Sequence, residues 1–162
     1  MAIANPTIVD YKPFKIGYKV GDVENVADTL TQFGLIVKSN PYKVMPDMKE
    51  PYGNDWKDED GTDEYVKGMK HKSYDIQVSF YVKAKDDTTK TAAEYVRDAQ
   101  KDFFDVIKNG DLKIYDAYTG IGRQKVRYVG TSGESFREKD GTARLIFTVT
   151  FRVNDPVTLI TL

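Results

Sequence analysis

The strongest strand signal in this sequence is the stretch Ala143-Arg144-Leu145-Ile146-Phe147-Thr148-Val149-Thr150-Phe151-Arg152-Val153. Apolar side chains occupy every second position, and arginine or threonine occupies most of the positions between them. Because successive side chains of a β-strand point to opposite faces, this alternation predicts a strand with one buried face. Asn154-Asp155-Pro156 is expected to end the strand, since proline cannot donate to a β-ladder.

A second strand with strict alternation is expected at residues 73–83. Its predicted inward positions are Tyr74, Ile76, Val78, Phe80 and Val82. We expect Ile76, Val78 and Phe80 to share a buried sheet face with the apolar positions of residues 143–153, because two half-buried strands bury their apolar faces most simply side by side.

One amphipathic helix is expected at residues 91–109, between these two strands. Thr91 and Glu94 have the spacing of a capping box, in which each side chain accepts a hydrogen bond from the other residue's backbone N–H. Apolar residues recur at helical spacing: Ala92, Val96, Ala99, Phe103, Val106 and Ile107. Asn109-Gly110 is expected to stop the helix. Phe104 lies at the margin of the apolar face, where we expect an extra core residue rather than a subunit contact.

Shorter strands are expected at residues 11–20, 33–37, 112–118 and 124–131, with room for one helical turn in the polar stretch 22–32. Gly120-Ile121-Gly122 is interpreted as a turn, and Lys139-Asp140-Gly141-Thr142 carries a hairpin signal. The fold class predicted is α+β, a mostly antiparallel β-sandwich or split barrel with one flanking helix (about 91–109). The chain is expected to form a single domain over residues 1–162.

Residues 46–72 differ from the rest of the chain, because they are acidic, aperiodic and punctuated by proline and glycine. We interpret them as a long loop or hairpin that projects from the body. The aromatic residues Tyr52 and Trp56 lie among carboxylates such as Asp58 and Asp60. These four residues are the predicted subunit interface, since interfaces are enriched in aromatic side chains. The alternative is that Trp56 folds back onto its own domain as a lid. Residues 2–10 are expected to form a second, N-terminal arm.

No catalytic, cofactor-binding or metal site is expected. The chain has one histidine and no cysteine. His71, between two lysines, is expected to be a solvated surface residue. The acidic cluster 55–64 does not place glycine at the sixth position of a calcium loop from either starting aspartate. No phosphate-binding loop is present, since Gly120-Ile121-Gly122-Arg123 lacks the residues of that motif. An enzyme is therefore not expected.

Charge and hydropathy exclude further classes of protein. With 24 basic and 25 acidic residues the net charge is −1, so dedicated nucleic-acid binding is not expected. No apolar run approaches the roughly 18 residues that span a bilayer. The first six residues lack the basic and apolar regions of a secretory signal, so the protein is expected to be made and kept in a cytoplasm until it is assembled.

The order of elements in the C-terminal half resembles the ring-forming domain of siphophage distal tail proteins, a relative of the tail-tube fold. The resemblance rests on a two-faced strand, one amphipathic helix, the short stretch Leu112-Lys113-Ile114-Tyr115-Asp116, and a long final strand that ends in Asn154-Asp155-Pro156. Residues 126–134 lie between the short stretch 112–116 and the long final strand, as in that family. Residues 28–35 resemble the family's opening segment, and residues 54–61 fall where these proteins carry a variable loop.

This resemblance implies a structural protein of the phage tail, without catalytic residues and without cofactors. It implies a homo-hexameric ring at the distal end of the tail tube, which contacts tube and baseplate or tail-tip proteins. DNA would pass through its lumen without specific binding, and no membrane contact is implied. The location implied is the virion, with assembly in the bacterial host cytoplasm. Relatives often carry a further lectin-like domain, and the chain stops at Leu162, so no carbohydrate-binding role is expected. A tail-tube or tail-terminator protein, and a monomeric soluble binding module, stay open as alternatives.

Overall fold

The computed structural model describes residues 13–39, 45–85, 89–139 and 141–162. Its elements in chain order are β1 (Phe14–Val20), β2 (Val23–Asp28), α1 (Thr29–Phe33), β3 (Ile36–Ser39), β4 (Tyr52–Asn54), β5 (Asp63–Tyr65), β6 (Tyr74–Lys83), α2 (Ala92–Ile107), β7 (Leu112–Asp116), β8 (Ile121–Lys139) and β9 (Thr142–Val153). Seven strands form one sheet in the order β2-β1-β7-β8-β9-β6-β3, and β4 pairs with β5 in a separate hairpin. All strand pairs within the described residues are antiparallel, so the α+β, mostly antiparallel class is confirmed.

The register of β6 and β9 is the one that the alternation predicts. Phe80 lies opposite Phe147, and Ile76 lies opposite Phe151, so their side chains share one face of the sheet. All four side chains are at most 2% exposed. The buried face is therefore continuous across the two strands whose sequences alternate most regularly.

The sheet is strongly curved. Phe14 of β1 and Phe80 of β6 meet edge to face with ring centroids 5.8 Å apart, although three strands separate β1 from β6 in the sheet order. In a flat sheet these strands would be roughly 19 Å apart, since neighbouring strands are about 4.8 Å apart. The sheet thus curls around its own apolar face, as in a split barrel.

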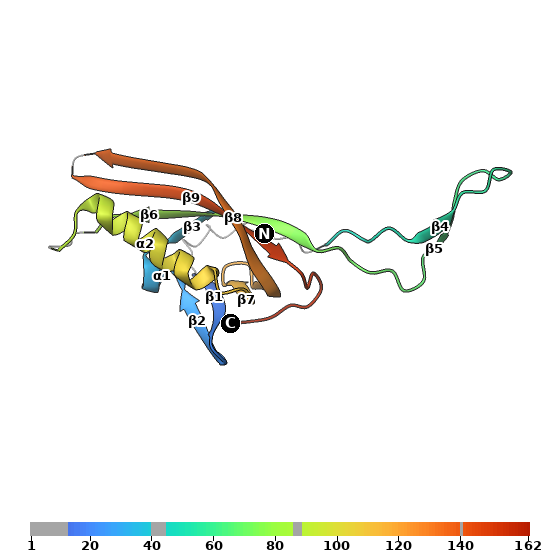
Figure 1. Ribbon diagram of the computed structural model, residues 1–162, viewed down its shortest axis with the longest axis horizontal. Coiled ribbons are helices and arrows are strands. Elements are labelled where there is room, and N and C mark those ends of the chain that lie inside the picture. The colour runs from blue at the N-terminus through green and yellow to red at the C-terminus, as the bar shows by residue number, and fades with distance from the viewer. Residues whose placement is uncertain (1–12, 40–44, 86–88, 140) are drawn as a thin grey trace, which may run out of the picture.

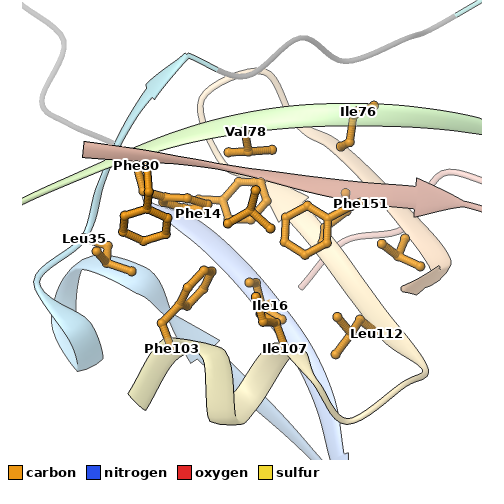
Figure 2. Packing of buried hydrophobic residues seen from close by; sticks show 14 of the residues in the cluster. Phe14, Ile16, Leu35, Ile76, Val78, Phe80, Phe103, Ile107, Leu112 and Phe151 are labelled. Atoms are coloured by element: carbon orange, nitrogen blue, oxygen red, sulfur yellow. The ribbon is translucent and has the colours of Figure 1, made fainter. Parts of the chain in front are cut away.

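Helix α2 fills the inside of this curved sheet. Phe103 lies 4.9 Å from the ring of Phe80 and 6.2 Å from that of Phe147, measured between centroids. Figure 2 shows Phe103 and Ile107 of α2 pointing toward Phe14, Ile16 and Phe80. The predicted capping box is present, because Glu94 N donates to Thr91 Oγ1 and Thr91 N donates to Glu94 Oε2. The helix begins and ends within two residues of its expected bounds.

The N-terminal part differs in detail from the expectation. Residues 22–32 hold the edge strand β2 as well as the expected helical turn, which is α1. The Asp28 carboxylate caps α1 by accepting from the N–H groups of Leu30 and Thr31, and Gly34 ends it in the left-handed conformation. Phe33 therefore belongs to this short second helix rather than to a strand, and β3 starts three residues later than expected.

Strand β8 is longer than the sequence predicts and contains Gly122, which was expected in a turn. The turn lies before it, around residues 117–120, where Gly120 N donates to the carbonyl of Asp116. Gly122 is needed because the C-terminal segment crosses it closely. A Cβ at this position would lie 2.2 Å from the carbonyl oxygen of Ile160. The second half of β8 is exposed on both faces, so it has no burial alternation for a sequence pattern to reveal.

Candidate subunit interface

Residues 46–72 form an arm that projects from the sheet along the long axis of the molecule (Figure 1). The arm is closed at its base, where Lys49 N donates to Lys70 O and Lys72 N donates to Asp47 O, both at 2.7 Å. Farther out, the short strands β4 and β5 pair Tyr52 with Tyr65. The expectation of a projecting loop or hairpin is confirmed, and the structure shows it to be a hairpin.

The four predicted interface residues all lie on this arm, and all are exposed. Tyr52 is 76% exposed and Trp56 is 55% exposed. In the structure Trp56 is not a lid on its own domain, because the arm leads away from the sheet (Figure 1). Asp58 and Asp60 follow Trp56 at the end of the hairpin, and neither forms an ion pair within the described ranges. The expected N-terminal arm, residues 2–10, lies outside the residues that the structure describes.

Two more apolar side chains of the arm were not singled out from the sequence. Tyr65 is 64% exposed and lies opposite Tyr52 in the hairpin, and Val66 is 62% exposed. Their alternation is too short to give a strand signal. A packed core would bury residues of this kind, so an arm that exposes them is typical of a segment that another surface covers.

His71 corrects an expectation at the base of the arm. An isolated antiparallel β-bridge joins its backbone to that of Met48, and the residue is partly buried. Its Nδ1 atom is buried without a hydrogen-bond partner among the atoms described. It is therefore not a freely solvated residue.

A groove runs between α2 and the outer half of β8. Phe104, expected to be an extra core residue, is 42% exposed and packs edge to face on Tyr128 with centroids 5.6 Å apart. The Lys108 ammonium lies 5.9 Å from the Phe104 ring. Phe136 at the far end of the groove is 50% exposed. The groove is open to solvent along its length rather than an enclosed cavity.

The C-terminal segment is fixed to the sheet by buried or partly buried polar groups. The Asp155 carboxylate accepts from Gln124 Nε2 at 2.7 Å and from the N–H groups of Val157 and Thr158. These hydrogen bonds, that of Gln124 foremost, lower the pKa of Asp155 to about 2. Arg123, which is 1% exposed, donates from Nε to the hydroxyl of Tyr74 and from Nη1 to the carbonyl of Thr158. The sequence suggested no role for Arg123, because its partners are far away in the chain.

The described part of the chain contains no group of three or more histidine, aspartate or glutamate side chains placed to hold a metal ion. It also contains no helix long and apolar enough to cross a membrane.

Comparison with known proteins is informative only at the level of structure. No protein-family model and no curated protein matches the sequence. The fold is similar to the crystal structure of SPP1 Dit (gp 19.1), described as a paradigm of the hub adsorption apparatus in phages that infect Gram-positive bacteria. The two are 15% identical with a TM-score of 0.57, and the match covers 90% of this chain.

The resemblance expected from the sequence is confirmed at the level of fold. The match covers 51% of the Dit chain, so this chain spans about half the length of the structure that it resembles.

Proposed function

We propose that this chain is a structural protein of a phage tail that forms a hexameric ring at the distal end of the tail tube and links it to the host-adsorption apparatus. The observation that carries the proposal is the fold, which is similar to a phage hub protein over 90% of this chain. The distal position and six copies are part of the proposal.

The exposed surface supports a role in assembly. The arm and the groove both present aromatic side chains, namely Tyr52, Trp56, Phe104 and Phe136. These two surfaces come from different parts of the molecule, so neighbouring copies could meet through unlike surfaces, head to tail. Such heterologous contacts close into a ring when the rotation between copies permits it.

The same features weigh against the other classes. A monomeric binding module would hold its ligand in a concave pocket, whereas the main grooves here are open. A non-enzymatic role is part of the proposal, and the likeness in fold to a phage hub protein supports it. A net charge of −1 would let DNA pass through a ring lumen without the phosphate contacts that a strongly basic wall would make.

The mass of the assembled chain tests the proposal. Sedimentation velocity at increasing protein concentration should show one species with six times the mass of the 18.4 kDa chain. A single species of monomer mass at every concentration, together with a monomer mass when the chain is co-expressed with tail-tube protein, would contradict it.

A further inference from the structure

A row of exposed cations lies across the sheet at the end opposite the arm. Arg144 of β9 is paired in register with Lys83 of β6 on one side and with Arg137 of β8 on the other. Residues directly opposite one another in antiparallel strands point to the same face. These three side chains therefore lie on the outer face, since their neighbours Val82 and Leu145 point inward. Lys139 extends the row toward the hairpin turn and lines the same hollow as Arg137 and Arg144.

We call these four residues the basic row (Lys83, Arg137, Lys139 and Arg144). Several cations elsewhere on the body form ion pairs with a carboxylate. Lys113 pairs with Glu24, Lys90 with Asp98, and Arg152 with Asp75. No residue of the basic row forms an ion pair within the described ranges, and all four are exposed. Four adjacent like charges repel one another in the isolated chain, so a partner that supplies carboxylates would relieve this repulsion.

An apolar row borders the basic row on the same face. Ile146 of β9 lies opposite Tyr81 of β6, and Tyr81 lies opposite Ile36 of the edge strand β3. Ile36 is 39% exposed, and Tyr81 and Ile146 are partly buried. The outer face thus offers cations beside a strip of apolar surface, which together fit an acidic segment that also carries an aromatic side chain.

The arm of this same chain has that composition. Residues 55–64 contain six carboxylates, one lysine and Trp56. These carboxylates form no ion pair in the described structure, although Lys57 lies among them in sequence. Charge and side-chain type are therefore complementary between the arm and the outer face.

The arm does not meet the basic row of its own chain. The arm leads into the first residue of β6, Tyr74, whereas Lys83 is the last residue of that strand. Ten strand residues span roughly 30 Å. The arm also projects in the direction away from the β8–β9 turn (Figure 1). A second copy placed head to tail could present its basic row to the arm without either chain refolding.

We propose that the arm of one copy docks on the outer face of the next copy, with the carboxylates of residues 55–64 against the basic row and Trp56 on the strip formed by Ile36, Tyr81 and Ile146. This inference rests on the proposed function, because the contact is the one that joins neighbouring copies in the ring. It specifies which surfaces meet, which the likeness of fold does not.

The contact can be tested by disulfide cross-linking, because the natural chain contains no cysteine. One preparation carries Asp58→Cys and a second, differently tagged, carries Arg137→Cys. The two are mixed, concentrated and oxidised. Each chain has a single thiol, so a disulfide between the two tags reports a contact between copies. We expect the mixed species to form at least about tenfold faster at low salt than with Lys19→Cys as the second preparation, and to slow in high salt because screening weakens the attraction. Lys19 is exposed on the β1–β2 hairpin, away from the basic row.

A charge exchange gives an independent readout. Arg137→Glu with Arg144→Glu should weaken self-association by about tenfold or more, and Asp58→Lys with Asp60→Lys should do the same. Mixing the two double variants should restore cross-copy association, since each then offers the charge that the other lacks. Equal cross-linking rates with Arg137→Cys and Lys19→Cys, or unchanged association of both double variants, would overturn the proposal. Capture of a different tail protein by Asp58→Cys in particles, with no cross-link between copies, would also overturn it.

The proposed function and this contact can fail separately. Rings of six copies without the cross-link would leave the function standing and reject the contact. A cross-link in open chains or dimers, with no closed ring, would support the contact and reject the hexameric ring.

Discussion

Phe147 and Phe136 lie in the same β8–β9 hairpin but in opposite environments. Phe147 is 1% exposed and touches the rings of Phe80 and Phe103, whereas Phe136 is 50% exposed beside α2. A buried aromatic side chain loses both its burial and its ring contacts when it is truncated, and the surrounding residues cannot fully close the cavity.

Phe147→Ala should therefore lower the free energy of unfolding by about 3–5 kcal/mol. Phe136→Ala serves as the matched control and should lower it by less than about 1 kcal/mol. Urea unfolding followed by circular dichroism measures both. Equal losses in the two variants would mean that Phe147 contributes no more to the packed core than the half-exposed Phe136.

The Asp155 carboxylate gives a prediction of how the stability of the fold depends on pH. Its pKa in the folded protein is about 2, below its ordinary value of 3.8, because Gln124 and the N–H groups of the C-terminal segment hydrogen-bond the charged form. A carboxylate whose pKa is lower in the folded state stabilises the fold at any pH above its ordinary pKa. This contribution to stability is lost as the pH falls from about 4 toward 2.

Asp155→Asn should therefore be less stable than the unaltered chain at pH 6, by about 1 kcal/mol, since solvent partly screens this carboxylate. The difference should shrink between pH 4 and pH 2. Thermal unfolding of both chains over that range measures it. A difference that stays constant with pH would show that the carboxylate acts through shape rather than charge.

At the scale of elements, the sequence predicts best those segments whose environment repeats along the chain. Strands β6 and β9 and helix α2 each have one buried face, so the period of their apolar residues reveals them. The outer half of β8 has no buried face, and β2 is a mostly exposed edge strand, so neither carries such a period. These strands form because a neighbouring strand pairs with them, and the sequence does not show that neighbour directly.

Only part of the candidate interface could likewise be predicted from the sequence. The arm could be predicted because an acidic stretch with Trp56 does not fit a core. The basic row could not, because Lys83, Arg137 and Arg144 come from three strands, and only their register brings them together. Arg123 was missed for a similar reason, since its acceptors lie on β6 and in the C-terminal segment.

The arm also carries a prediction of its own. Trp56→Ala should change the free energy of unfolding of the monomer by less than about 0.5 kcal/mol, because Trp56 is more than half exposed and lies away from the core. It should weaken association between copies by about 2 kcal/mol, as expected for an aromatic side chain at the centre of an interface.

Tyr118→Ala is the matched control for Trp56→Ala. Tyr118 is 69% exposed in the turn before β8, and its loss should change neither stability nor association. Denaturation at low concentration and sedimentation at high concentration separate the two effects. A Trp56→Ala chain that unfolds much more easily as a monomer, yet assembles normally, would place Trp56 in the fold rather than in the interface.

For the whole molecule, the shape and the charges act together. The curved sheet with α2 inside it makes a stable body, and it leaves the arm at one end and the basic row near the other (Figure 1). Opposed complementary surfaces favour head-to-tail assembly over a symmetric dimer, because a two-fold contact would use the same surface on both copies. A closed ring uses both surfaces on every copy and leaves neither exposed.

Electron cryomicroscopy of the assembled chain at residue resolution tests this account most directly. We predict a closed ring of six copies around an open channel, in which the arm of each copy lies on the outer sheet face of the next and Trp56 is buried between them. Monomers with an enclosed ligand in the body, or a ring in which the arms extend free into solvent, would contradict it.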